Sequence, residues 1–295
     1  MVTADARPIG MFDSGVGGLT VARAVIDLLP HEDLVYFGDT ARCPYGPRSE
    51  REVRAFALEI MDSLVTEGVK LLVVACNAAA SSALDDARSR YDVPIVSVIE
   101  PGVNAAIAAT RNGRIGVIGT QRTIDSGAYE RAVAATGSDV ALFSKACPLF
   151  VDFVERGDTT SRELVRVALE YLAPLESAGI DTLILGCTHY PLLAGVIRYV
   201  FGERVVLISS ADATATEVYG RLKDDGLLNQ QSARGVHRFV ASSQEGISSE
   251  LGTRFLGPEF RPVEYRPWRS AGDPLAAGAT TGLTDGATPD ETRTR

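Results

Sequence analysis

The sequence predicts an α/β fold with parallel β-sheets, and three observations support this class. Short runs of β-branched and apolar residues alternate along the 295-residue chain with segments of helical periodicity, the order typical of parallel α/β architectures. Several of these runs are apolar at every position, as in strands that helices cover on both faces. The length suits two domains or one large α/β domain.

Ten segments are predicted to be strands, and one helix has an especially clear pattern. The helix Glu50–Glu67 carries a stripe of apolar side chains at i, i+3, i+4 and i+7 spacing. Ser49 and Glu52 form the capping box that marks its start. The predicted strands are Pro8–Asp13, Asp33–Gly38, Lys70–Ala75, Pro94–Val98, Arg114–Ile118, Val140–Phe143, Asp181–Leu185, Arg204–Ile208, Val236–Ala241 and Pro262–Tyr265.

Further helices are predicted in the second half of the chain. Thr160 and Glu163 have capping-box spacing at the start of a helix that runs to about Ala178. The segment Ala211–Lys223 is also predicted to be helical, and the strands after it are expected to complete the first sheet. The residues Arg269–Arg295 are mostly Gly, Ala, Thr, Pro and Asp, a composition that predicts a disordered C-terminal tail.

The composition favours a globular protein and excludes several other classes. The chain is 45% hydrophobic and carries a formal net charge of −9, so direct nucleic-acid binding through a basic face is not expected. Met1–Pro8 lacks the features of a signal peptide, and no apolar run approaches the roughly 20 residues of a membrane helix. We therefore expect a cytoplasmic protein without membrane contact, whose four cysteines are not structural disulfides.

The chain contains a weak internal repeat. Ile9-Gly10 resembles Ile115-Gly116, and Leu72–Asn77 resembles Leu183–Thr188. The two offsets, 106 residues from Ile9 to Ile115 and 111 from Cys76 to Cys187, nearly agree. Two copies of one α/β unit, with equivalent cysteines facing each other across a cleft, would explain the pattern. Chance similarity between strand ends remains the alternative.

Two cysteines are candidates for chemistry. A cysteine that ends an apolar strand is usually a small buried hydrophobic residue. Cys76 and Cys187, however, each lie at the carboxyl end of a predicted strand and at the start of a helix, where ligands bind in open α/β sheets and where thiolates are favoured. Asn77-Ala78 and Thr188-His189 place backbone N–H groups beside each sulfur, and His189 is positioned to tune Cys187.

Two loops are weaker candidates for a binding site. The segment Asp13–Gly18 follows the first strand and precedes a helix, so it fits either an anion-binding loop or a tight turn capped by Asp13. Thr20 stands where a dinucleotide fingerprint requires a third glycine, which excludes that motif. In the loop Asp39–Gly46, Tyr45-Gly46 can line a pocket, although loops rich in Pro and Gly often have no such role.

The remaining candidates have structural interpretations by default. Cys43 and Cys147 both precede proline and lack the strand-end setting, so they are interpreted as structural. Glu155, on the amphipathic segment Leu149–Arg156, is expected to be a solvated surface charge in the absence of other context.

Taken together, these residues resemble the glutamate racemases of the aspartate/glutamate racemase family. The resemblance extends from about Pro8 to Trp268. Four segments carry it: Phe12–Leu19, Gly38-Asp39-Thr40 with Pro44-Tyr45-Gly46, Ala75-Cys76-Asn77, and Leu185–Leu192.

The resemblance implies a particular architecture and activity. It implies two flavodoxin-like, doubly wound domains with pseudo-twofold symmetry and the active site between them, formed by residues 1–99 plus 210–268 and by residues 100–209. It also implies an isomerase that interconverts L- and D-glutamate, supplies D-glutamate for peptidoglycan and cell shape, and needs no cofactor and no metal. A homodimer is common in the family and is expected here.

The family's functional residues map onto matching positions. Cys76 and Cys187 correspond to the two acid/base cysteines. Supporting or auxiliary roles fall on Asp13, His189, Asp39, Glu155 and Thr120. Substrate-binding roles fall on Asp13, Ser14, Tyr45, Gly46, Asn77, Ala78, Thr188 and His189. The chain departs from the family at Ala78, where threonine is usual, and Ser81 or Ser82 is a candidate to replace the missing hydroxyl.

The two thiols fit the chemistry of racemisation. One base cannot remove the α-proton from one face and return a proton to the other without moving the substrate, whereas two opposed thiols can. Of three alternative functions, two stay open and one is disfavoured. Another cofactor-free racemase, for aspartate or hydantoin, and a non-catalytic amino-acid-binding protein stay open. A cysteine phosphatase is disfavoured because Cys76 is followed by Asn-Ala-Ala-Ala-Ser-Ser, without an arginine.

Overall fold

The computed structural model describes residues 5–260 and 263–268. All ten predicted strands are present, with ends that differ from the predicted ones by at most three residues. The predicted tail, 269–295, lies outside the described residues. The strands are β1 Ile9–Asp13, β2 Leu34–Gly38, β3 Leu71–Val74, β4 Ile95–Ser97, β5 Arg114–Gly119, β6 Ala141–Ala146, β7 Thr182–Gly186, β8 Val206–Ser209, β9 His237–Ala241 and β10 Glu264–Tyr265.

Helices alternate with these strands as the periodicity predicts. They are α1 Leu19–Leu28, α2 Glu50–Thr66, α3 Asn77–Arg90, α4 Ile99–Ala109, α5 Gln121–Asp125, α6 Ala128–Thr136, α7 Leu149–Glu155, α8 Arg162–Ser177, α9 Ala194–Phe201, α10 Ser210–Asp224 and α11 Ser249–Leu256, with short 3-10 turns η1 Tyr190–Leu193, η2 Gly202–Arg204 and η3 Gly257–Glu259. Among the described helices, none is long and apolar enough to cross a membrane.

One predicted helix start is confirmed and another is wrong by one residue. Ser49 and Glu52 form the complete capping box of α2. At α8 the cap is Ser161 instead of Thr160, because the extended backbone of Ser161 brings its hydroxyl to the N–H of Leu164 at 3.1 Å. The N–H of Thr160 donates instead to the carboxylate of Asp158 in the preceding turn, at 3.4 Å.

The strands form two parallel sheets with matching order. The six-stranded sheet has the order β10-β9-β2-β1-β3-β4 and the four-stranded sheet has the order β6-β5-β7-β8. Thus β2-β1-β3-β4 and β6-β5-β7-β8 have the same topology, which confirms the internal repeat. In this repeat β1 corresponds to β5 and β3 to β7, so the strands before Cys76 and Cys187 are equivalent.

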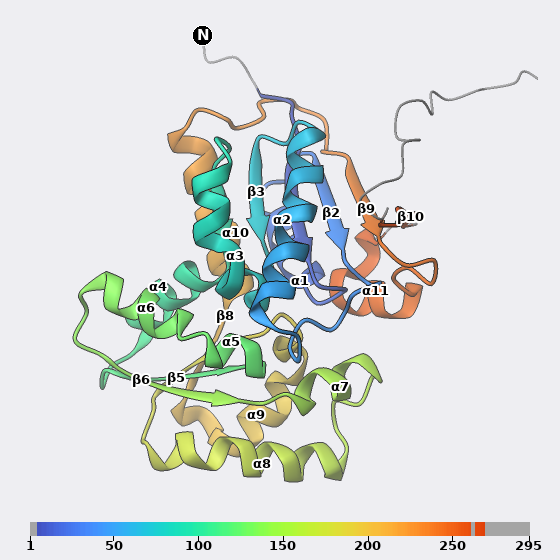
Figure 1. Cartoon of the computed structure of the whole chain (residues 1–295). Helices are drawn as coiled ribbons and strands as arrows, with labels where there is room; N and C mark the ends of the chain where they lie inside the picture. The colour runs from blue at the N-terminus through green and yellow to red at the C-terminus, as the bar shows by residue number, and fades with distance from the viewer. Residues whose placement is uncertain (1–4, 261–262, 269–295) are drawn as a thin grey trace, which may run out of the picture.

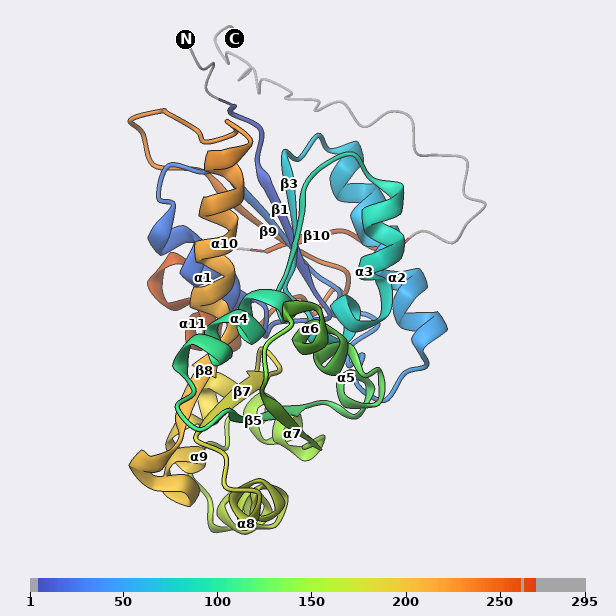
Figure 2. The ribbon, with the colours of Figure 1, turned by 90° about the vertical axis from the view of Figure 1, so that its left-hand side faces the viewer.

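Helices cover both faces of each sheet, as in a doubly wound fold. In the larger sheet, α1 and α10 lie on one face, and α2 and α3 lie on the other (Figure 2). In the smaller sheet, α8 and α9 lie on the face away from the larger sheet, while α4, α5 and α6 lie between the two sheets (Figure 1). After β8 the chain enters α10, which packs against α1 and leads back to the first sheet. The predicted domain boundaries at residues 99 and 209 stay a prediction.

Candidate active site

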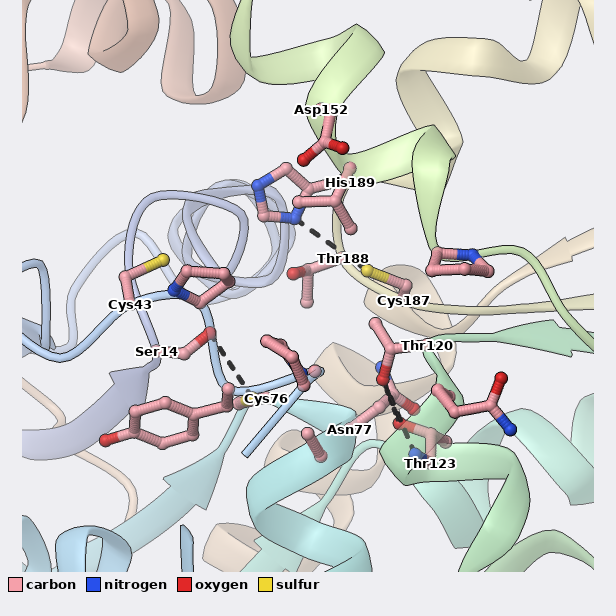
Figure 3. A pocket seen from close by; sticks show the side chains of 18 of the residues that line it. Ser14, Cys43, Cys76, Asn77, Thr120, Thr123, Asp152, Cys187, Thr188 and His189 are labelled. Atoms are coloured by element: carbon pink, nitrogen blue, oxygen red, sulfur yellow. Dashed lines mark hydrogen bonds between the residues drawn. The ribbon is translucent and has the colours of Figure 1, made fainter. Parts of the chain in front are cut away.

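The carboxyl ends of β1, β2 and β3 face those of β5 and β7 across a cavity of about 250 Å³. Eleven of the predicted site residues line this cavity: Ser14, Tyr45, Gly46, Cys76, Asn77, Ala78, Thr120, Glu155, Cys187, Thr188 and His189. Figure 3 shows Cys76 beside Ser14 and Cys187 beside His189, with the two pairs on different walls. The cavity therefore brings together residues that the sequence separates by more than 100 positions.

Cys76 lies at the point where β3 passes into α3. It is the residue before the first turn of α3 and has an extended backbone, and only 5% of it is exposed. Its Sγ donates to Oγ of Ser14 at 3.6 Å. Burial, reinforced by the charge of Asp13, raises the pKa of the Cys76 thiol to about 12. Cys76 is therefore protonated near neutral pH.

Cys187 occupies the equivalent strand end but has a different partner. Its Sγ lies 3.8 Å from Nδ1 of His189, and Nε2 of His189 lies 3.3 Å from a carboxylate oxygen of Glu155. Burial by itself would lower the pKa of His189, but the contacts with Cys187 and Glu155, together with the charges of Cys187 and Asp13, raise it to about 10. The imidazole of His189 thus lies between the Cys187 sulfur and the carboxylate of Glu155.

Asp13 lies behind the cavity wall and does not line it. It ends β1, is fully buried, and accepts the N–H of Gly15 at 3.0 Å, while its Oδ1 has no hydrogen-bond partner in the described structure. Burial raises its pKa, and the charge of His189 opposes that rise. The charge of Asp13 thus disfavours a thiolate at Cys76 and favours protonation of His189.

The glycine loop after β1 brings the two halves of the site into contact. A Cβ atom at Gly17 would collide with Oγ1 of Thr188 and would lie 2.6 Å from Nδ1 of His189. Glycine is therefore needed here for close approach between the β1 loop and the Cys187 loop. The segment Asp13–Gly18 forms a turn in which Gly18, and not Asp13, is the residue before α1. Anion binding by this loop stays a prediction.

The rest of the wall combines apolar side chains with a few polar groups, and it contains no lysine or arginine among the described residues. Oδ1 of Asn77 accepts the hydroxyl of Tyr129 at 2.7 Å, and its buried Nδ2 has no protein partner among the described residues. Thr120 and Thr123 share a hydrogen bond of 3.1 Å. The first turn of α3 adds backbone N–H groups without partners inside the helix. An anionic ligand would thus be held by amides, hydroxyls and backbone N–H groups.

Three predictions about this region are corrected. Ser81 and Ser82 do not replace the missing hydroxyl at position 78, because both donate to the carbonyl oxygen of Ala78 at 2.9 Å. Cys43 is not only structural, since it lines the cavity. Glu155 is not a simple surface charge, because it faces His189. Cys147 is buried away from the cavity, as predicted.

Asp39 is also outside the cavity. It is fully buried, and its carboxylate accepts hydrogen bonds from Arg42 and Tyr45 instead of facing the thiols. Any role in the site is therefore indirect, through the loop that contains Tyr45.

Sequence reasoning missed nine of the cavity residues: Cys43, Pro44, Pro47, Gln121, Thr123, Pro148, Leu149, Val151 and Asp152. Four of them belong to α7 or the residue before it, a segment with only an amphipathic pattern. Thr123 had a detectable signal, because Thr120 precedes it by three residues and its hydroxyl accepts the N–H of Thr123 as the cap of α5. Within the described residues, no cluster of three His, Cys, Asp or Glu side chains could hold a metal ion.

Comparison with known proteins gives a consistent assignment. Residues 19–218 match the family described as Asp/Glu/Hydantoin racemase. The glutamate racemase of Acidothermus cellulolyticus is 59% identical over 257 residues, 87% of this chain and 97% of that protein. The glutamate racemase of Parafrankia sp. is 56% identical over 261 residues, 88% of this chain and 94% of that protein.

Solved structures agree with these relatives. Glutamate racemase isoform RacE1 from Bacillus anthracis superposes with a TM-score of 0.84 at 41% identity and covers 90% of this chain and 98% of its own. Glutamate racemase from Francisella tularensis, in complex with D-glutamate, has a TM-score of 0.83 at 34% identity and covers 89% of this chain and 98% of its own. The chain therefore belongs to the Asp/Glu/Hydantoin racemase family and, within it, to the glutamate racemases, which are isomerases.

Proposed function

We propose that this protein interconverts L- and D-glutamate by a two-base mechanism in which Cys76 and Cys187 exchange protons with the α-carbon, without a cofactor. The observation that carries the proposal is the placement of two buried thiols at equivalent strand ends on different walls of one cavity. Relatives named as glutamate racemases, at 56 to 59% identity, support the substrate.

The proton transfers follow from the two environments. Starting with thiolate at Cys187, the sulfur takes the α-proton, and the electron pair of the C–H bond remains on the substrate, delocalised into its α-carboxylate. Cys76, held as a thiol by burial and by Asp13, delivers its proton to the opposite face and becomes the thiolate. The product has inverted configuration, and proton exchange with solvent restores the starting state. The reverse reaction starts from the other protonation state.

The cavity supports a small dicarboxylate with one ammonium group. Partner-free Nδ2 of Asn77 and the first-turn N–H groups of α3 are suitable donors for carboxylate oxygens. Asp152 and Glu155 add negative charge to the same cavity, which suits the ammonium group. Protonated His189 is the single cationic side chain of the described lining and lies beside Cys187.

Circular dichroism of pure protein with L-glutamate or D-glutamate, without added cofactor, tests the activity. We expect both enantiomers to lose signal toward a racemic mixture. Persistent signal from both would reject the proposal, and binding without turnover would indicate a non-catalytic amino-acid-binding protein. Turnover of aspartate or hydantoins in place of glutamate would assign another member of the family.

The first prediction concerns the two thiols. Cys76→Ala and Cys187→Ala should each lose nearly all racemisation, because each removes one of two required proton carriers, a loss expected to exceed roughly 100-fold. Cys147→Ala is the matched control, since Cys147 is buried outside the cavity. Initial rates by circular dichroism, with melting temperatures to establish folding, provide the measurement. Near-normal turnover in either of the first two variants would contradict the assignment.

We further propose that the D-glutamate formed supplies peptidoglycan synthesis and cell shape, as the family resemblance implies. A cytoplasmic location and a homodimer also stay predictions. Light scattering coupled to size-exclusion chromatography would determine the oligomeric state.

A further inference from the structure

The loop between β2 and α2 forms one wall of the cavity. Five of its residues line the cavity: Cys43, Pro44, Tyr45, Gly46 and Pro47. Its tip also reaches the other half of the molecule, because the carbonyl oxygen of Gly46 accepts the N–H of Arg122 at 3.3 Å. The position of this loop therefore sets the shape of the cavity opposite Thr120.

Asp39 anchors the base of this loop from beneath. One carboxylate oxygen accepts Nε of Arg42 at 2.6 Å and the hydroxyl of Tyr45 at 2.5 Å. The other accepts Oγ of Ser242 at 2.8 Å and Nε1 of Trp268 at 2.7 Å. The first two donors belong to the loop itself, and the last two come from segments about 200 residues later.

Trp268 also holds the Arg42 side chain in place. The Arg42 guanidinium lies between two aromatic rings, 4.0 Å from the centroid of Trp268 and 4.2 Å from that of Phe56, and donates to Glu59 at 2.6 Å. The Trp268 ring contacts Phe37 of β2 at a centroid distance of 5.1 Å. Stacking, ion pairing and an indole hydrogen bond thus converge on one loop.

We propose that Trp268 is a positioning residue for the substrate-binding wall: through Asp39 and Arg42 it holds the Tyr45-Gly46 segment in the geometry that binds glutamate. The inference rests on the proposed function. Trp268 does not line the cavity, and it lies outside the contacts of both thiols. Its loss should therefore weaken substrate binding much more than proton transfer.

Trp268→Phe tests the proposal because it keeps an aromatic ring and removes the N–H donor to Asp39. We expect the KM for L-glutamate to rise about tenfold, the scale of one hydrogen bond to a charged group, with kcat within about twofold of wild type. Tyr265→Phe is the control, since Tyr265 is an exposed residue of neighbouring β10 and should leave both constants unchanged. Ser242→Ala removes a second donor to the same Asp39 oxygen and should also raise KM without lowering kcat. This variant tests the role of Asp39 in positioning the loop if Trp268→Phe does not fold.

A spectroscopic readout needs no variant. The chain has one tryptophan, so all indole emission reports on this contact. Saturation of the wild-type protein with glutamate should shift Trp268 emission, with a midpoint near the KM. An unchanged KM in Trp268→Phe, even with a lower melting temperature, would show a purely structural residue and overturn the proposal. A fall in kcat with constant KM would overturn it as well.

Failure of this proposal can be distinguished from failure of the proposed function. If wild-type protein does not turn over glutamate, the proposed function fails. Acrylamide quenching of Trp268 fluorescence then tests separately whether Asp39 holds the indole in place. Asp39→Asn should increase quenching relative to wild type, because the indole loses its charged acceptor. Equal quenching would show that Asp39 does not hold Trp268.

Discussion

The two catalytic candidates are equivalent in position and different in charge environment. Cys76 contacts a neutral hydroxyl and lies near buried Asp13, whereas Cys187 contacts His189, which Glu155 supports. A symmetric fold thus contains an asymmetric pair of thiols. The proposed mechanism uses this asymmetry, because it needs one sulfur to begin as a base while the other begins as an acid.

The charge on His189 predicts how stability depends on pH. Its pKa is raised from 6.5 to about 10 in the folded protein. Because the folded value lies above the unfolded value, protonation of His189 stabilises the fold fully below pH 6.5, and this contribution is lost as the pH rises toward about 10. We therefore expect the melting temperature of the wild type to be higher than that of His189→Asn. This difference should be largest at about pH 6 and should shrink toward pH 10.

Thermal unfolding of both proteins in matched buffers measures this difference. Subtracting the variant removes the titration of groups that the two proteins share. A difference that stays constant from about pH 6 to pH 10 would mean that His189 is neutral in the folded state. In that case the imidazole beside Cys187 would carry no positive charge.

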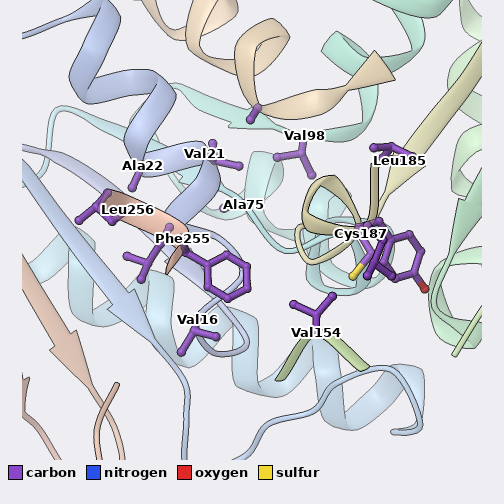
Figure 4. Packing of buried hydrophobic residues seen from close by; sticks show 14 of the residues in the cluster. Val16, Val21, Ala22, Ala75, Val98, Val154, Leu185, Cys187, Phe255 and Leu256 are labelled. Carbon is purple, nitrogen blue, oxygen red and sulfur yellow. The ribbon is translucent and has the colours of Figure 1, made fainter. Parts of the chain in front are cut away.

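At the scale of elements, α11 supports the Cys187 side of the site. Its Phe255 is buried and meets the His189 ring edge-on, with 5.5 Å between ring centroids. Figure 4 shows Phe255 in the same apolar cluster as Val16, Val154 and Cys187. The helix therefore packs directly against the imidazole of His189.

Phe255→Ala should consequently affect both stability and catalysis. Replacing a buried phenylalanine by alanine leaves a cavity and costs about 3 to 5 kcal/mol of folding free energy. The cavity also frees His189 to rotate away from Cys187. Phe201→Ala is the matched control, because Phe201 is also buried and lies at the end of α9. Both variants should melt earlier, but only Phe255→Ala should lose kcat, by roughly tenfold or more. An equal loss in both would assign the effect to general destabilisation.

The elements themselves were largely predictable. Strands such as Leu71–Val74 are continuous apolar runs, so their type follows from composition and their ends are uncertain only by a residue or so. The start of α8 was misplaced because Thr160 and Ser161 are both good caps, and the choice depends on the turn that Asp158 makes. Local sequence does not determine which of two adjacent hydroxyls reaches the helix.

At the scale of the whole molecule, the repeat explains why the site could be found and why it was found incompletely. Equivalent strand order in the two sheets places Cys76 and Cys187 at matching ends, and the motifs around them show this. Asp152 carries no such motif and lines the cavity only because α7 packs against it. Likewise, the contact of Trp268 with Asp39 spans 229 residues, and nothing in local sequence indicates it.

The arrangement of two sheets around one cavity predicts an isotope asymmetry. Racemisation of L-glutamate is started in heavy water and stopped early, and deuterium is measured separately in each enantiomer by mass spectrometry after chiral separation. The thiol on the product side has equilibrated with solvent before substrate binds, so nearly every D-glutamate molecule formed should carry deuterium. The thiol that removed the proton holds protium and returns mostly protium when the carbanion collapses backward.

Deuterium should therefore accumulate in product much faster than in unreacted L-glutamate, and the reaction from D-glutamate should show the mirror image. Equal labelling of both pools from the first time points would mean that one base serves both faces, or that the thiols exchange with solvent faster than the carbanion collapses. Product that carries mainly protium would be more damaging. It would require one group to carry the same proton across the substrate, which two separate sulfurs on different walls cannot do, so the assignment of Cys76 and Cys187 as opposed bases would then be wrong.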